Sequence, residues 1–238
     1  MAAPPALMIL RIATFNIHRS IGRDGIENPA RIAELLREID ADLIALQEVS
    51  AMPGHPEDSL RLLEEATNSR AVMGRTLFDK NSHYGNALLS RLKINSCDRL
   101  DISVANREPR GLIDVELFIN GYTVAVMATH LGLAYAERRR QIDEILSTVE
   151  KHTADVVILL GDFNEWFVWR PAFRRLQHRF KPTPTLATFP AHRPVLGLDR
   201  IWLHPQERLM SLEVHSTELS KIASDHLPLV AEIDLGQR

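Results

Sequence analysis

The sequence predicts an α/β protein built from two mixed β-sheets that pack face to face, with helices outside. Segments with the hydrophobic pattern of strands outnumber the helices, of which about four are scattered between them. Neighbouring strands joined by short turns pair antiparallel, so a purely parallel, doubly wound sheet does not fit. With 238 residues, 45% of them hydrophobic, the chain is long enough for one large domain with a substantial core.

In the first half of the chain, strands and helices alternate with polar loops. A first strand is expected from Met8 to Asn16. A helix is expected to begin at Asn28 and Pro29, a capping residue followed by a proline at the first helical position. Its apolar residues recur at helical spacing: Ile32, Leu35, Leu36 and Ile39. The elements expected next are a short strand over 43–48, a helix over 59–67, and strands over 71–77 and 84–91.

The second half contains the clearest strand signals. Strands over 112–119 and 122–130 flank Asn120-Gly121, the strongest short hairpin signal, and another strand is expected over 95–101. The apolar run Val156–Leu160 predicts a strand buried on both faces, and Gly161 is expected to turn the chain at its end. The remaining elements are helices over 137–152 and 171–180, a loop over 182–194, and strands starting at 198, at 209 and after 224.

Composition excludes some classes of protein. The formal net charge of −3 gives no general attraction to polyanions, which counts mildly against a nucleic-acid substrate. The single cysteine, Cys97, excludes an intrachain disulfide and fits a reducing compartment. The sequence has no basic leader region and no apolar run long enough for a membrane span. We therefore expect a cytoplasmic protein with no transmembrane segment, no obligate protein partner and one domain over 1–238, in which 1–7 form a flexible tail.

Polar side chains recur where the apolar strands end. The set is Asn16, Glu48, His130, Asp162, Asn164, Asp199, Asp225 and His226. Asp162 and Asn164 point the same way if the chain stays extended between them. Oxygen ligands such as Glu48 and Asp225 suit Mg²⁺ or Mn²⁺ and not structural zinc. Two histidines and a spare aspartate then remain for proton transfer, which is the division of labour that phosphate-ester hydrolysis needs.

Six short motifs in this order resemble those of the endonuclease/exonuclease/phosphatase superfamily, the group of DNase I, AP endonucleases, sphingomyelinases and inositol-polyphosphate 5-phosphatases. The motifs are Thr14-Phe15-Asn16, Leu46-Gln47-Glu48, Thr129-His130-Leu131, Gly161-Asp162-Phe163-Asn164, Leu198-Asp199-Arg200-Ile201 and Ser224-Asp225-His226. The resemblance implies a four-layered α-β-β-α sandwich of the DNase I type, with the site at one edge of the two sheets.

The resemblance also implies roles for these residues. Glu48 would be the main ligand of Mg²⁺ or Mn²⁺, with Asn16 and Asp225 beside it. Asp162 would accept the proton of the attacking water, or ligate a second metal ion, and Asn164 would orient the nucleophile or a phosphoryl oxygen.

Two histidines would contact the phosphate. His226 would bind a phosphoryl oxygen as charge builds, held in one tautomer by Asp199. His130 would bind the phosphate from the other side. For Asp199, the alternative is a strand-start acid paired with Arg200.

Further candidates would contact the substrate. Arg110 is a candidate phosphate clamp, because a guanidinium matches two oxygens at once. Asn86 and His18 are assigned to the substrate, His18 because it follows Asn16 by two residues. Trp166 belongs to the expected recognition segment 165–170, which is completed by Arg174, Arg175 and Phe189. Within these segments, Phe167 and Phe173 are assigned to core packing.

The chain departs from the nuclease branches of the superfamily. DNase I-like members have Arg or Lys where this chain has Ser50, and AP endonucleases have Tyr where it has His130. Thr-His-Leu is similar to sphingomyelinase-like, phosphatase-like and small bacterial members. The sequence thus favours hydrolysis of a phosphodiester or phosphomonoester in a small molecule or lipid head group. A DNA or RNA nuclease is the alternative, if Arg107, Arg110 and 138–140 line one groove, and a binding protein without turnover is a third.

Overall fold

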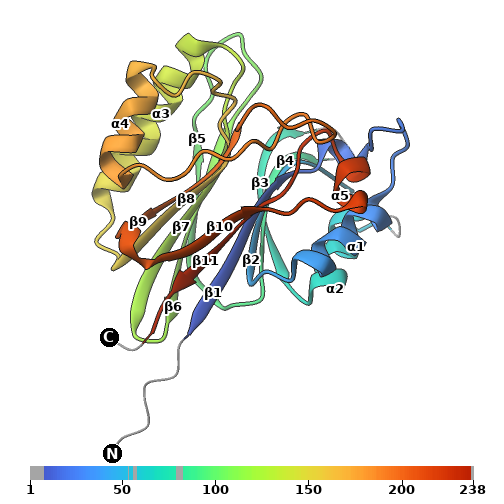
Figure 1. Ribbon diagram of the computed structural model, residues 1–238, viewed down its shortest axis with the longest axis horizontal. Coiled ribbons are helices and arrows are strands. Elements are labelled where there is room, and N and C mark those ends of the chain that lie inside the picture. Colours follow the sequence, from blue (N-terminus) through green and yellow to red (C-terminus); the bar gives the residue numbers. More distant parts are fainter. Residues whose placement is uncertain (1–7, 53, 56–57, 79–82, 237–238) are drawn as a thin grey trace, which may run out of the picture.

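The computed structural model describes residues 8–236, apart from 53, 56–57 and 79–82. Two β-sheets pack face to face, and helices cover the outer face of each (Figure 1). This confirms the predicted α-β-β-α sandwich. Residues 1–7, where a flexible tail was expected, lie outside the described residues, and the single domain over 1–238 stays a prediction.

The first sheet has six strands in the order β10-β11-β1-β2-β4-β3. Only the pair of β1 and β2 is parallel within this sheet. Its outer face packs against α1, α2 and the end of α5. The strands are β1 (Ile9–Asn16), β2 (Leu43–Ala51), β3 (Arg70–Phe78), β4 (His83–Ser90), β10 (Leu209–Val214) and β11 (Leu229–Asp234), and the helices are α1 (Pro29–Ile39), α2 (Ser59–Thr67) and α5 (Glu218–Ala223).

The second sheet has five strands in the order β5-β6-β7-β8-β9. The parallel pair β7 and β8 is connected through α3, which packs with α4 on the outer face. The strands are β5 (Ile94–Asp101), β6 (Gly111–Ile119), β7 (Tyr122–His130), β8 (Val156–Asp162) and β9 (Asp199–His204), and the helices are α3 (Tyr135–Lys151) and α4 (Pro171–Phe180). Two short 3-10 turns, His18–Ser20 and Gln206–Arg208, complete the described elements.

Strand β8 explains why its sequence is apolar without a break. Ile158 and Leu160 face the first sheet, whereas Val157 and Leu159 face α3 and α4. Both faces of this strand are therefore buried, as the sequence predicts.

Helix α1 begins as its sequence predicts. The side chain of Asn28 accepts a hydrogen bond from the backbone N–H of Arg31, and Pro29 is the first helical residue. Helix α5 was not predicted, because six residues are too few to display a 3.6-residue period. The reciprocal hydrogen bonds of Thr217 and Ser220 cap its start.

Two local expectations about strand ends are wrong, and the condition that the chain stays extended from Asp162 to Asn164 is not met. Strand β2 continues past Glu48 to Ala51, because Glu48 (φ +58°) sits in a bulge where Gln47 and Glu48 together face one residue of β4. Gly161 lies inside β8, where a Cβ would come within 1.9 Å of the Thr129 carbonyl oxygen. The chain is not extended at Asn164, whose φ is +49°.

Among the residues that the structure describes, we find no helix with both the length and the apolar character that a bilayer crossing requires. The cytoplasmic location stays a prediction.

Candidate active site

Three neighbouring strands place candidate residues side by side. His130 at the end of β7 pairs in register with Asp162 at the end of β8, and Asp162 pairs with Asp199 at the start of β9. Paired residues on adjacent strands project from the same face of a sheet, and here that face is turned toward the first sheet. All three side chains are buried. Backbone pairing therefore builds a row of one histidine and two carboxylates.

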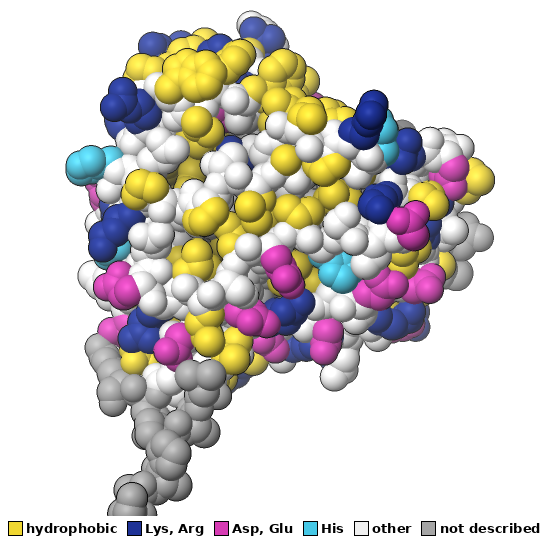
Figure 2. All heavy atoms as spheres, viewed as in Figure 1, with side chains coloured by type: hydrophobic (Ala, Val, Ile, Leu, Met, Phe, Trp, Pro, Cys, Tyr) yellow, Lys and Arg dark blue, Asp and Glu magenta, His cyan; other side chains and the backbone are white. Residues whose placement is uncertain are grey.

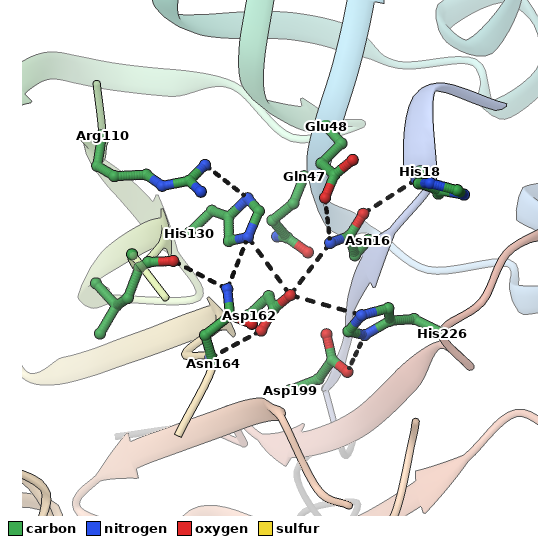
Figure 3. Close-up of polar contacts among 12 residues, drawn as sticks. Asn16, His18, Gln47, Glu48, Arg110, His130, Asp162, Asn164, Asp199 and His226 are labelled. Atoms are coloured by element: carbon green, nitrogen blue, oxygen red, sulfur yellow. Dashed lines mark hydrogen bonds and ion pairs between the residues drawn. The ribbon is translucent and has the colours of Figure 1, made fainter. Parts of the chain in front are cut away.

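Asp162 is the centre of the site (Figure 3). Its Oδ2 atom accepts a hydrogen bond from Asn16 Nδ2 (3.1 Å) and lies 3.5 Å from His130 Nε2 and 3.7 Å from His226 Nε2. Its Oδ1 atom accepts from the backbone N–H of Asn164 (2.9 Å). Side chains from both sheets thus converge on one carboxylate.

The contact between Asp162 and Asn164 depends on the left-handed backbone of Asn164. This conformation aims the Asn164 N–H back at Asp162, and the Asn164 amide nitrogen reaches the Leu131 carbonyl (3.0 Å) and His130 Nε2 (3.1 Å). Asn164 therefore fixes both Asp162 and the loop that follows β7.

His226 is held as a charged partner of two carboxylates. Its Nδ1 atom lies 2.9 Å from Asp199 Oδ2, which also accepts a 2.5 Å hydrogen bond from the Thr188 hydroxyl. Burial disfavours the charged ring, but Asp199 and then Asp162 outweigh this effect and raise the pKa of His226 to about 10. Arg200, the alternative partner of Asp199, donates to its backbone oxygen instead.

His130 is held in the opposite state. Burial lowers the pKa of His130 to about 3. The charge of Asp162 acts against this lowering, and the charge of Arg110 adds to it. Arg110 Nη1 lies 3.3 Å from His130 Nδ1, and the Asn164 amide nitrogen, which also can only donate, lies 3.1 Å from Nε2. The neutral ring can accept at only one of its two nitrogens, so the two donors compete for it, and Nε2 also faces Asp162.

The first sheet supplies a third carboxylate, that of Glu48. Glu48 Oε1 and Asp162 Oδ2 both accept from the single Asn16 amide nitrogen, at 3.1 Å each. The Asn16 oxygen accepts from the backbone N–H of His18 (3.0 Å). Asn16 is a neutral donor, so its contact does not balance the charge of Glu48, and carboxylate oxygens of this kind fit a hard divalent cation.

A second group of possible ligands lies deeper. Asp162, Asp199 and His226 offer ligand atoms within 4.8 Å of one another. In this cluster Asp199 Oδ2 lies 2.9 Å from His226 Nδ1 and also accepts from the Thr188 hydroxyl. The cluster and the Glu48 edge share Asp162, and both are candidate cation sites.

The predicted substrate residues divide into buried and outlying groups. Arg110 is buried, forms an ion pair with Glu108 and contacts His130. Asn86 is also buried, and its amide donates to the Gly111 carbonyl (3.3 Å), which ties β4 to the residue after Arg110. Asn86 thus lies where it supports Arg110.

The outlying candidates have fewer links to Asp162. His18 Nδ1 lies 4.0 Å from Asp225 Oδ1, and Asp225 is linked to Asn16 through Ser224, whose hydroxyl contacts both residues. Trp166 is exposed on the loop after Asn164. Phe167 is exposed as well, so its assignment to the core is wrong, whereas Phe173 is buried as expected.

Sequence reasoning missed three residues around the site. Thr188 shares Asp199 with His226, and Ser224 holds the chain between Asn16 and Asp225. Tyr84 on β4 lies under the Arg19 guanidinium (4.8 Å), and burial together with the nearby charge of Glu48 raises its pKa. Thr188 lies in an irregular loop, where no sequence pattern marks it. Tyr84 stands two residues before Asn86 in the same strand, so the spacing could have indicated that both side chains face the site.

The two-sheet sandwich with acids and histidines buried at one end of its strands defines a DNase I-like protein. A sequence profile of the endonuclease/exonuclease/phosphatase family matches residues 13–226, and the chain belongs to this family. The uncharacterized protein YbhP of Escherichia coli strain K12 is 30% identical over 246 aligned positions, which cover 94% of this chain and 96% of YbhP.

Two solved structures illustrate the fold. An endonuclease/exonuclease/phosphatase from Beutenbergia cavernae superposes with a TM-score of 0.76 at 22% identity, covering 96% of this chain and 72% of that one. D. rerio TDP2, solved with a single-strand DNA product, superposes with a TM-score of 0.70 at 16% identity, covering 94% of this chain and 98% of TDP2.

Proposed function

We propose that this protein is a divalent-cation-dependent phosphoesterase that hydrolyses a phosphodiester or phosphomonoester by in-line attack of water. The observation that carries the proposal is the pair of histidines on either side of Asp162, one charged and one neutral, within 3.7 Å of the same carboxylate oxygen. Membership of the family supports phosphate-ester chemistry. The carboxylate can accept a proton, and the histidines on its two sides can stabilise the charge that develops on the phosphate.

In this mechanism Asp162 accepts the proton of the attacking water, and Asn164 orients that water or a phosphoryl oxygen. His226, already protonated, donates to a phosphoryl oxygen as negative charge builds there. His130 binds the phosphate from the other side. A divalent cation, Mg²⁺ or Mn²⁺, held by Glu48 with Asn16 and Asp225 would stabilise the developing phosphoryl charge when bound.

The substrate that we favour is a small molecule or a lipid head group. The chain carries a net charge of −3, and Arg138, one of the arginines that would line a nucleic-acid groove, is buried in an ion pair with Glu165. Phosphate contacts supply most of the affinity of a protein for nucleic acids, so the burial of Arg138 removes one of the cations that such a groove would need.

A panel of substrates tests the proposal. It contains bis-p-nitrophenyl phosphate, nucleotides, inositol phosphates, phospholipids and DNA, each with Mg²⁺, Mn²⁺ or EDTA. We expect hydrolysis of at least one phosphate ester with Mg²⁺ or Mn²⁺ and loss of at least about 100-fold in rate with EDTA, because the developing charge then lacks its counterion. Equal rates with EDTA and Mg²⁺ would refute the cation requirement, and binding without hydrolysis would favour a binding protein.

A nuclease is the second candidate, and the similarity to TDP2 bound to single-strand DNA favours keeping it. Exposed Arg107, Arg139 and Arg140 remain available for phosphate contacts. In the DNA arm of the panel, a nuclease would lose affinity steeply between low and moderate salt, since each neutralised phosphate releases counterions.

Replacement of Asp199 tests how His226 keeps its charge. Asp199→Asn removes the strongest favourable charge at His226 and leaves burial to dominate, so the pKa of His226 is expected to fall from about 10. The folded parent holds this proton up to about pH 10, and the variant is expected to lose it at lower pH, which moves the alkaline limb of the rate profile downward. NMR titration of the His226 ring measures the change.

Thr188→Val is the matched control. It removes the second hydrogen bond to Asp199 Oδ2 but keeps the carboxylate charge, so the shift should be smaller. If Asn at position 199 leaves the titration unchanged, Asp199 does not set the charge of His226.

A further inference from the structure

Beside the candidate site lies an exposed apolar surface formed by Leu133, Trp166, Phe167 and Trp169, here called the aromatic surface. The exposed fractions are 75% for Leu133, 59% for Trp166, 37% for Phe167 and 67% for Trp169. Large apolar side chains gathered outside a core mark an interaction surface, since exposing them to water is unfavourable. The segment 165–170 directly follows Asn164, so this surface adjoins the reacting groups.

A buried ion pair joins the two segments that form the aromatic surface. Arg138 donates from Nε (3.2 Å) and Nη2 (3.1 Å) to Glu165 Oε2, and from Nη1 to the carbonyls of Gly132 (3.2 Å) and Leu133 (2.5 Å). The other carboxylate oxygen of Glu165 accepts from the backbone N–H of Phe167 (2.9 Å). One guanidinium thus fixes Leu133 next to the loop that carries the tryptophans.

A second arginine holds the rings from the side. The guanidinium of Arg170 lies 5.0 Å from the centre of the Phe167 ring and 4.3 Å from that of Tyr135, and its Nε is 3.7 Å from Glu165 Oε1. The ring centres of Phe167 and Trp169 are 5.0 Å apart. The rings of Phe167 and Trp169 are therefore preorganised, which lowers the entropic cost of binding through them.

The charge around the aromatic surface is positive. The segments 131–140 and 163–175 contain two acids, Glu137 and Glu165, and both are buried. The same segments contain the exposed arginines Arg139, Arg140, Arg174 and Arg175, of which Arg175 forms an ion pair with Asp143. Figure 2 shows hydrophobic side chains gathered at the top of the molecule, over α3 and α4, with Lys and Arg side chains around them.

We propose that the aromatic surface docks the protein on an anionic lipid bilayer. Tryptophan suits the boundary between head groups and acyl chains, because one part of its ring system is apolar and its N–H is polar. A leucine three-quarters exposed beside the rings gains from an acyl environment and offers nothing to a nucleobase. The surrounding arginines match anionic head groups.

Docking in this way brings phosphate esters at the bilayer surface to Asp162. This consequence rests on the proposed function, but binding to a bilayer is measured without turnover. A phosphoesterase that does not bind vesicles would overturn the docking alone, and a vesicle-binding protein without hydrolysis would overturn the proposed function alone.

The test measures binding to vesicles with the full chain. One set of vesicles contains equal parts of phosphatidylcholine and phosphatidylglycerol, and the other contains phosphatidylcholine only. Trp166 and Trp169 are exposed whereas Trp202 is buried, so a blue shift of tryptophan fluorescence on binding reports the aromatic surface. We expect sedimentation with the anionic vesicles, a blue shift, and quenching by lipids brominated in the acyl chains.

The double variant Trp166→Ala/Trp169→Ala is expected to lower partitioning onto anionic vesicles at least about tenfold, because two side chains no longer enter the bilayer. Phe118→Ala is the matched control: Phe118 is 66% exposed in β6, beside the hairpin turn into β7 at the other end of the sheet (Figure 1). This control should bind as the parent does.

Three results would overturn the proposal. They are equal binding of both vesicle types, no loss of binding in the double variant, or a blue shift with single-stranded DNA and none with anionic vesicles. The last result would assign the surface to nucleic acid.

Discussion

Glu48→Gln is expected to lower the rate of metal-dependent hydrolysis of bis-p-nitrophenyl phosphate at least about 100-fold. This loss exceeds the one expected when a residue that only hydrogen-bonds to a metal ligand is replaced. The change keeps the shape of the side chain and removes its charge. Asn16 then contacts one carboxylate, that of Asp162, and one neutral amide. The site loses a negative charge, which weakens its attraction for a cation. Rates over a range of Mg²⁺ concentrations measure the loss.

Glu213→Gln provides the control, because it removes an exposed carboxylate from β10 and should leave the rate unchanged. Circular dichroism checks that both variants fold. A Glu48→Gln protein that hydrolyses the ester at the parent rate would show that the cation site is wrongly placed.

His226→Ala is expected to reduce turnover by about 10²- to 10⁴-fold while binding of the metal persists. The charged ring lies 3.7 Å from Asp162 and carries a proton at neutral pH, so its removal takes away a donor for the phosphoryl oxygen. Single-turnover rates measure the chemical step, and Mn²⁺ binding followed by electron paramagnetic resonance measures the metal.

The fold contains a second histidine–aspartate pair that serves as the control. His152 Nε2 lies 2.8 Å from Asp114 Oδ2, at the end of α3 and in the middle of β6. His152→Ala removes a comparable contact elsewhere, so it should affect stability more than turnover. Equal losses of turnover in the two variants would point to general destabilisation and not to a role of His226 in the reaction.

Most elements of the fold were predictable because their signals are local. Helix α2, strand β7 and helix α4 have the predicted boundaries, since Asp58, Asn120-Gly121 and Pro171 mark their starts. The six motifs identified the family for a different reason. They are short segments at strand ends, and the order of the strands brings them together.

The details of the site depend on backbone geometry that a hydrophobic pattern does not encode. The bulge at Glu48 and the left-handed Asn164 decide where two side chains point, yet both residues follow ordinary apolar strands. Thr188 and Ser224 act through contacts between distant segments, which a single sequence does not reveal. The sequence offered Arg138 as one of the arginines of a possible nucleic-acid groove, and only the structure reveals its buried partner Glu165.

The positions of His130, Asp162 and Asp199 are fixed by the strands that carry them. The spacing of this row is inherited from the hydrogen bonds of β7, β8 and β9, the most deeply enclosed part of the second sheet. The segments that border the row, 131–134 and 165–170, are loops. Divergence in those loops can therefore change what the candidate site accepts while the distances among His130, Asp162 and Asp199 stay the same.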